Sequence, residues 1–231
     1  MLALERLHLT REDFALDANL EIPEGARVAI LGPSGAGKST LLAAIGGFLS
    51  PQSGRILWDG KDITGAEPAA RPVATIFQDN NLFPHLTALR NVALGLDPTG
   101  RLSATTRDRA LAALRDVGLD GFADRKPGVL SGGQQSRVTL ARAMLQDKPI
   151  LLLDEPFSAL GPAMKAEMID LVLRVAEERG LTVLMITHDP ADALRLGGLS
   201  LVVADGVAHP PRPTTELMDD PPPALRDYLA R

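Results

Sequence analysis

The sequence predicts an α/β fold with a mainly parallel core sheet, and three observations support this prediction. Continuous apolar runs at residues 150–153 and 181–186 are typical of strands covered on both faces. Between them, residues 163–178 carry apolar side chains at helical spacing, as a crossover helix does. Residues 28–48 read as an apolar strand, a glycine-rich loop and a helix in succession. Strands that alternate with helices favour a parallel sheet.

The glycine-rich loop has the features of a phosphate cradle. It matches the P-loop pattern G-x-x-x-x-G-K-[ST] through Gly32, Pro33, Ser34, Gly35, Ala36, Gly37, Lys38, Ser39 and Thr40. The glycines let successive backbone N–H groups point at phosphate oxygens, and the following helix adds its N-terminal partial positive charge. We expect Lys38 to reach the β- and γ-phosphates of ATP, Ser39 to bind Mg²⁺, and Thr40 to contact the α-phosphate region.

Two carboxylates follow the apolar strand at residues 150–153. Adjacent side chains at the end of a strand point in different directions, so Asp154 and Glu155 can take separate tasks. We expect Asp154 to hold Mg²⁺, directly or through water, and Glu155 to polarise the attacking water as general base. Acids also favour helix N-caps, but a P-loop in the same chain favours the catalytic interpretation.

The rest of the chain divides by composition. Strands are predicted at residues 55–58 and 73–77, whereas residues 79–130 show no strand pattern and include an amphipathic helix at residues 107–117. We therefore predict a helical subdomain at 79–130, inserted in a nucleotide-binding core of residues 1–78 and 131–206. Residues 207–231 hold six of the eighteen prolines and are predicted to form a Pro-rich tail.

Composition limits the classes of partner. The net charge of −5 and the scarcity of aromatic residues (6 Phe, 1 Trp, 1 Tyr) argue against a nucleic-acid partner, which needs clustered cations and stacking platforms. No apolar run approaches the roughly 18 residues that cross a bilayer, so we expect any membrane association to come through a partner protein.

Together with the P-loop and the two carboxylates, the segment Leu130-Ser131-Gly132-Gly133-Gln134 resembles the signature of ATP-binding cassette ATPases. The resemblance covers residues 1 to about 206 and implies a P-loop NTPase fold with an N-terminal antiparallel β portion. It implies that Gln78 is the Q-loop glutamine, which senses Mg²⁺ and the membrane partner, and that His188 is the switch histidine, which contacts the γ-phosphate. Lys38, Gln78, Glu155 and His188 would then be the catalytic set, and Ser39, Gln78 and Asp154 the metal ligands.

The resemblance also implies that the signature acts in trans. Ser131, Gly132, Gly133 and Gln134 would bind the ATP held by a second subunit's P-loop, so that a homodimer encloses two nucleotides. This chain departs from the family pattern at Gly161, where an aspartate is usual, and at Gln135-Ser136, where Arg-Gln is frequent. For adenine stacking we expect Arg11, through its guanidinium plane, or Phe14, which could equally be a core residue.

Residues 77–87 resemble the Q-loop of bacterial importer ATPases that work with a periplasmic solute-binding protein, and Asn80-Asn81 resembles those of thiamine importers. The resemblance implies an ATPase subunit on the cytoplasmic face of the bacterial inner membrane that energises import of thiamine or its phosphates. An integral membrane permease would be its direct partner and the solute-binding protein an indirect one. Leu82, Phe83 and Leu86 fit a groove for a permease helix, or belong to the subdomain core.

Other functions stay open. Importers of iron, polyamines or sulfate use similar ATPase subunits. A soluble cassette ATPase of translation or DNA repair is a further alternative, but such proteins usually carry two fused cassettes or a long coiled-coil insertion. A catalytically weak regulatory cassette would account for Gly161, and a P-loop kinase would have no use for the signature.

Overall fold

The computed structural model describes residues 1–11, 14–79, 81–223 and 225–226, so Asn80 lies outside the described residues. These residues form one 11-stranded sheet, in the order β5-β4-β1-β2-β10-β9-β3-β8-β7-β6, with β11 paired to β9. The strands are β1 (Leu2–Arg11), β2 (Phe14–Ile22), β3 (Arg27–Leu31), β4 (Ser53–Trp58), β5 (Lys61–Asp62), β6 (Val73–Ile76), β7 (Ile150–Asp154), β8 (Thr182–Ile186), β9 (Leu199–Ala204), β10 (Val207–Ala208) and β11 (Arg212–Pro213).

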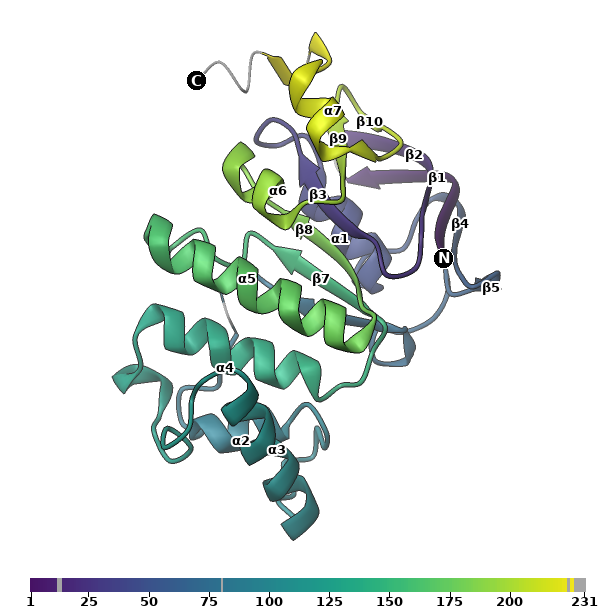
Figure 1. The fold of residues 1–231 in the computed structure, drawn as a ribbon. Coiled ribbons are helices and arrows are strands. Elements are labelled where there is room, and N and C mark those ends of the chain that lie inside the picture. Colours follow the sequence, from purple (N-terminus) through teal and green to yellow (C-terminus); the bar gives the residue numbers. More distant parts are fainter. Residues whose placement is uncertain (12–13, 80, 224, 227–231) are drawn as a thin grey trace.

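The sheet has a parallel and an antiparallel part. Strands β9, β3, β8, β7 and β6 are parallel to one another. Strands β2, β1, β4 and β5 pair antiparallel and form the opposite side of the sheet (Figure 1). The predicted α/β fold, with a mainly parallel core and an N-terminal antiparallel portion, is therefore confirmed.

Helices cover both faces of the parallel strands, with α1 on one face and α4 and α5 on the other. The helices of the described residues are α1 (Lys38–Gly46), α2 (Ala88–Ala93), α3 (Ala104–Asp116), α4 (Gly132–Met144), α5 (Pro162–Arg179), α6 (Pro190–Leu196) and α7 (Thr214–Asp219). Alternate residues of β7 lie on opposite faces of the sheet. Ile150 and Leu152 pack in the hydrophobic cluster that contains α1, whereas Leu151 and Leu153 pack in the cluster that contains α4 and α5. This two-sided burial explains the unbroken apolar run in the sequence.

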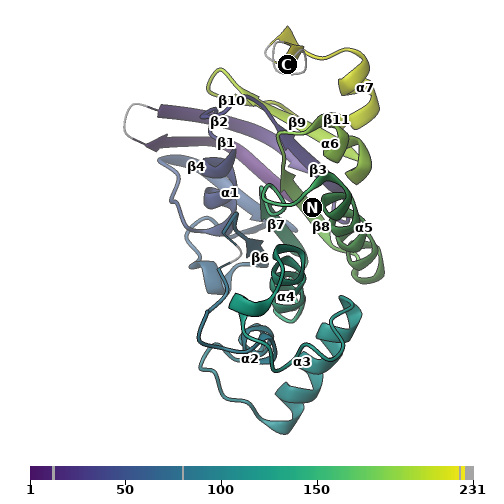
Figure 2. The same ribbon diagram turned by 90° about the vertical axis from the view of Figure 1, so that its left-hand side faces the viewer.

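Helices α2 and α3 lie at the end of the molecule away from β1 and β2 (Figure 2). Helices α2 and α3 fall within the predicted subdomain, residues 79–130, and both pack against α4, which begins just after it. A serine caps the N-terminus of α3 and of α4. Ser103 caps α3, and Ser131 forms a capping box with Gln134 at the start of α4. The exact subdomain boundaries stay a prediction.

Part of the Pro-rich C-terminal segment is incorporated into the fold. Strand β10 pairs with both β2 and β9, and β11 pairs with β9. Thr214, at the start of α7, is buried, and its hydroxyl lies 2.9 Å from that of Ser200 in β9. The sheet thus continues past residue 206, because proline is compatible with the very short strand β11 at its margin.

A buried arginine fixes the far end of α1. Arg71 is 2% exposed, and its guanidinium donates to the carbonyls of Ala44 and Ile45 in the last turn of α1, at 2.7 and 2.8 Å. It also donates to the carbonyls of Thr64 and Ala66. A cation at a helix C-terminus interacts favourably with the exposed carbonyls there. Arg71 therefore ties the helix that carries Lys38 to the segment that leads into β6.

Candidate nucleotide-binding site

The loop between β3 and α1 has the shape of a P-loop, and two of its glycines are required by close contacts. Gly32 has φ +144°, and a Cβ there would lie 2.0 Å from the carbonyl oxygen of Val203 in β9. Gly37 has φ +98°, and its Cβ would lie 2.3 Å from the ring of Phe14. Both positions exclude a side chain. The loop therefore lies against β9 at Gly32 and against Phe14, the first residue of β2, at Gly37.

Lys38, the first residue of α1, is held inside this loop. Its Nζ donates to the carbonyls of Gly32 and Pro33, each at 2.8 Å, and the residue is only 8% exposed. Burial lowers the pKa of Lys38, while the charges of Glu155 and Asp154 oppose that shift. The geometry therefore places a positively charged ammonium group in the loop at the N-terminus of α1, where a phosphate would bind.

Ser39 and Asp154 meet next to this lysine. The Ser39 hydroxyl donates to Asp154 Oδ1 at 3.0 Å, which joins the start of α1 to the end of β7. Burial raises the pKa of Asp154, the hydroxyl of Ser39 opposes that shift, and the charge of Glu155 adds to it. A hydroxyl and a half-buried carboxylate oxygen are hard ligands of the kind that Mg²⁺ prefers, so the residues present fit this ion.

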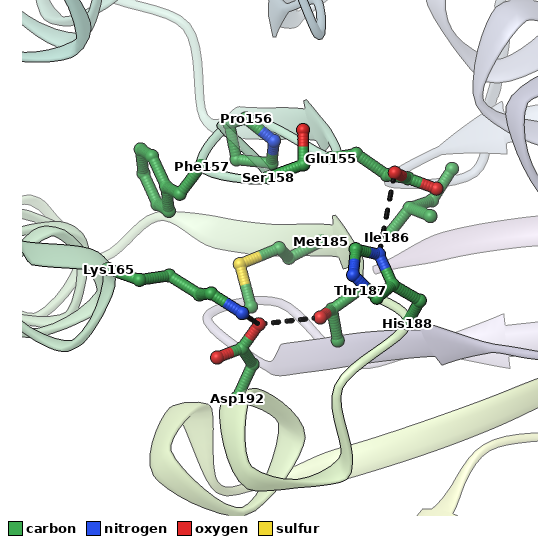
Figure 3. Close-up of a pocket in the computed structure, with 10 residues that line it drawn as sticks. All are labelled: Glu155, Pro156, Phe157, Ser158, Lys165, Met185, Ile186, Thr187, His188 and Asp192. Carbon is green, nitrogen blue, oxygen red and sulfur yellow. Dashed lines mark hydrogen bonds and ion pairs between the residues drawn. The ribbon is translucent and has the colours of Figure 1, made fainter. Parts of the chain in front are cut away.

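Glu155 and His188 face each other across the ends of β7 and β8 (Figure 3). Glu155 Oε2 lies 3.5 Å from His188 Nδ1. Glu155 has φ +45°, an uncommon conformation for a non-glycine residue that often marks functional sites. The carboxylate of Glu155 points toward the histidine (Figure 3).

The structure places both adenine candidates at the same cavity. Arg11 and Phe14 are paired at the end of the β1–β2 ladder. Both line a cavity of about 340 Å³ together with Ser34, Gly35, Gly37, Lys38, Ser39, Thr40 and Glu155. Phe14 also packs against the cluster that contains α1, so it is at once a partly buried core residue and a wall of the cavity.

The signature segment lies at the N-terminus of α4 and has its own packing. Ser131 and Gln134 bond reciprocally: the Ser131 amide donates to Gln134 Oε1 at 3.0 Å, and the Gln134 amide donates to the Ser131 hydroxyl at 3.3 Å. A Cβ on Gly132 would lie 3.2 Å from Leu160, and one on Gly133 would lie 2.7 Å from the sulfur of Met164. None of the four signature residues Ser131–Gln134 lines the P-loop cavity of its own chain.

No hydrogen bond or ion pair between the described residues holds the Gln78 side chain in the site. Gln78 lies two residues after the end of β6 and is exposed, and among the described residues no hydrogen bond joins it to Ser39 or Asp154. Its neighbour Phe77 instead lines a second cavity, which borders Ser39, Thr40 and Asp154. The structure therefore brings Lys38, Ser39, Asp154, Glu155 and His188 together and leaves Gln78 next to them.

The family model described as ABC transporter matches residues 16–158 of the chain. The chain belongs to the ABC transporter family. Among curated relatives, the thiamine import ATP-binding protein ThiQ of Cereibacter sphaeroides is 57% identical over 229 residues, which is 99% of each chain. The protein of the same name from Ruegeria sp. is 52% identical over 99% of each chain, and that from Shigella boydii is 48% identical over 89% of each.

Solved ABC cassettes have the same fold. MJ0796, described as a dimeric bacterial ABC transporter cassette, matches with a TM-score of 0.80 and 36% identity, over 93% of this chain and 99% of its own. MJ0796 in a dimeric post-hydrolysis state bound to ADP and Pi matches with a TM-score of 0.79 and 35% identity, over the same shares of the two chains.

Within this ABC cassette, the unusual Gly161 is the N-cap of α5. It has no side-chain cap and is followed by Pro162 at the first helical position. No atom of the described residues lies within 4 Å of a Cβ at Gly161, so the fold of these residues does not exclude the aspartate usual at this position in ABC ATPases.

Two residues that the sequence did not single out fix loops that carry predicted functional residues. Lys165 in α5 is bound to the carboxylates that follow His188. Asn91 in α2 is fully buried and fixes the loop at residues 83–87. An isolated lysine or asparagine carries no motif, so only the three-dimensional contacts reveal their roles.

Proposed function

We propose that the chain is the ATP-hydrolysing subunit of an importer, and that the imported solute is thiamine or one of its phosphates. The observation that carries the ATPase proposal is that Lys38, Ser39 and Glu155 line one P-loop cavity. Asp154 is bonded to Ser39, and His188 lies 3.5 Å from Glu155. Three relatives named thiamine import ATP-binding protein, at 48–57% identity over most of the chain, support the choice of solute.

Each residue of the site has a task in the hydrolysis of ATP. Lys38 and the loop amides bind the phosphates, and Glu155 accepts a proton from the water that attacks the γ-phosphorus. The bond from that phosphorus to the β,γ-bridging oxygen breaks, which yields ADP and inorganic phosphate. His188, beside Glu155, contacts the γ-phosphate. Ser39 and Asp154, with Gln78, would hold Mg²⁺, which neutralises charge on the phosphate oxygens.

Two copies of the chain work together in this proposal. The signature residues line no part of their own P-loop cavity, yet they present a helix N-terminus of the kind that favours anions. We infer that they bind the γ-phosphate held by the other subunit. The dimeric state of the related MJ0796 cassette supports this arrangement.

Attachment to the membrane comes through a partner in this proposal. Of the helices that the described residues form, none is long and apolar enough to cross a bilayer. We place the chain on the cytoplasmic face of the bacterial inner membrane, bound to an integral permease and indirectly to a periplasmic solute-binding protein. The curated relatives are named as import ATP-binding proteins, which supports this placement.

The loop at residues 83–87 is the candidate contact with the permease. The Asn91 side chain accepts from the Phe83 amide at 2.8 Å and donates to the carbonyls of Phe83, Leu86 and Thr87 at 3.1–3.2 Å. This fixed loop leaves Phe83 46% exposed, whereas Leu82 packs against the core. Phe83 is therefore the docking candidate, and a charge at Leu82 would also disturb folding.

We expect Phe83→Glu to lower solute uptake by tenfold or more, because a buried apolar contact at the centre of an interface often contributes about 2 kcal/mol or more. Nucleotide binding and the melting temperature of the purified chain should stay as in the wild type, because Phe83 is exposed in the isolated chain. Leu194→Glu is the matched control, because Leu194 is 50% exposed on α6, away from this loop. Equal uptake by the two variants would contradict a docking role for Phe83.

Uptake of labelled thiamine at low external concentration tests the proposed function directly. Source cells without the chain should lose uptake, and a plasmid copy should restore it, while uptake of iron, polyamines and sulfate should not change. Unchanged thiamine uptake would overturn the choice of solute. Loss of uptake of one of the other three solutes alone would assign the chain to that importer.

A further inference from the structure

Lys165 connects α5 to the loop that carries His188. Its Nζ donates to Asp189 Oδ2 at 3.0 Å and to Asp192 Oδ2 at 3.2 Å. The lysine side chain is 14% exposed and that of Asp192 13%, so the bond between these two residues is largely shielded from water, whereas Asp189 is 39% exposed. Figure 3 shows Lys165 beside Asp192. A shielded ion pair with two hydrogen bonds is more strongly directional than a solvated surface pair.

The residues on either side of His188 belong to the same network. The Thr187 hydroxyl donates to Asp192 Oδ2 at 2.7 Å and accepts from the Asp189 amide at 3.1 Å. Asp189 Oδ1 also accepts from the Ala191 amide at 2.9 Å, which caps α6. The backbone before and after His188 is thus fixed by carboxylates that share one lysine.

His188 itself has little else to hold it. Its side chain is 56% exposed; Glu155 lies 3.5 Å away, and the charge of His188 also acts on the adjacent Asp189, whose pKa it helps to lower. The position of the imidazole therefore depends on the backbone at residues 187–189, and this backbone depends on the network around Lys165.

The charges in this network make the lysine difficult to replace. Burial opposes the charged form, but the hydrogen bonds to Asp189 and Asp192 and the negative charges of these two residues together outweigh it and raise the pKa of Lys165. The lysine thus stays protonated at neutral pH. Without it, the shielded carboxylate of Asp192 would lie near that of Asp189 with no cation between them, and like charges that close repel each other.

The helix that carries Lys165 is a firm anchor. Leu160 and Met164, just before Lys165, contact the positions of Gly132 and Gly133 at the start of α4. Further along α5, Met168 and Val172 are fully buried in the cluster shared with α4. A loop bound to Lys165 is therefore bound to the packed centre of the molecule.

We propose that Lys165 is a positioning residue for His188: it pins the loop at residues 187–189 to α5 and so holds the imidazole beside Glu155. Lys165 is not a catalytic residue, because it lines the far side of the pocket that contains Glu155 and His188, away from the P-loop cavity. This role rests on the proposed ATPase function, in which His188 contacts the γ-phosphate.

The test combines Lys165→Met, which keeps the length of the side chain, with Lys165→Arg, which keeps its charge. In the assembled transporter we expect Lys165→Met to lower kcat for ATP by about 10- to 100-fold, the range expected when a catalytic group is displaced by about 1 Å, with KM within twofold. Lys165→Arg should restore most of this activity. Lys165→Met should cause no further loss in a chain that already carries His188→Ala, because the lysine acts through that histidine.

Nuclear magnetic resonance of the imidazole groups gives a second readout that does not depend on turnover. The chain has four histidines, so the signals of His188 can be assigned and followed. Lys165→Met should shift and broaden the His188 signals and leave those of His8, which lies in β1, unchanged. Asp192→Asn repeats the test from the other end of the bridge, in case the lysine variant does not fold.

Several outcomes would overturn the proposal. One is a kcat of Lys165→Met equal to that of the wild type. Another is the same fractional loss of kcat whether or not His188 is present, and a third is an unchanged His188 spectrum in a folded Lys165→Met variant. A wild-type transporter that hydrolyses no ATP would instead refute the proposed function, and this inference with it. The wild-type rate therefore separates the two failures.

Discussion

Glu155→Gln should abolish nearly all ATP turnover while it keeps two copies of the chain closed around the nucleotide. The amide has the shape of the carboxylate but cannot accept the proton of the attacking water, and loss of a general base lowers rates by about 10²- to 10⁴-fold. The substitution leaves Lys38 and the bond between Ser39 and Asp154 in place. Binding of ATP, which closes the dimer in the proposed function, should therefore survive.

Two measurements check this result: the rate of phosphate release from the assembled transporter, and the mass of the purified variant with ATP in size-exclusion chromatography. Glu178→Gln is the control, because Glu178 is an exposed residue near the end of the same α5 that follows Glu155. A Glu155→Gln variant that turns over ATP at the wild-type rate would contradict the role of general base. One that stays monomeric with ATP would count against the two-subunit site.

Lys38→Ala should weaken nucleotide binding and abolish solute uptake. The ammonium group lies within the P-loop, 2.8 Å from the carbonyls of Gly32 and Pro33, where bound phosphates would meet it. Hydrogen bonds that involve a charged group contribute about 1.5–3 kcal/mol, so the affinity for ATP should fall by about 10- to 150-fold. Labelled thiamine uptake in cells that carry this variant should drop to the level of cells without the chain.

Titration calorimetry with a slowly hydrolysed ATP analogue measures the change in affinity, and circular dichroism checks that the variant is folded. Lys61→Ala is the matched control, because Lys61 is exposed on the short strand β5. Should Lys38→Ala bind the analogue as tightly as Lys61→Ala does, the assignment of Lys38 to the phosphates would be wrong.

The P-loop and the paired acids were predictable because their chemistry depends on local spacing. Lys38 and Ser39 lie in one short motif, and Asp154 and Glu155 end one apolar strand, so the sequence alone contains these arrangements. The parallel sheet was predictable for a similar reason, since strands covered on both faces need continuous apolar runs.

The less predictable features depend on contacts between distant segments. Lys165 lies 24 positions before Asp189, and no local pattern marks such a pair. The sequence left Phe14 open as a stacking or core residue; the structure shows that it lines the cavity and packs against the core. Composition also gave no sign that strands β10 and β11 of the Pro-rich segment join the sheet, because two-residue strands have no periodicity.

The order of the strands in the sheet also has a consequence for biosynthesis. Strand β3, which leads into the P-loop, pairs with β8 and β9, so that Arg27 lies opposite Val183 and Leu31 opposite Val202. At about 5–20 residues per second, the ribosome needs roughly 10 to 30 seconds to make the chain between these partners. During this interval the nascent strand has neither neighbour. Nascent chains that stall before β9 should therefore fail to bind nucleotide and should depend on chaperones, even though they already contain the whole P-loop motif.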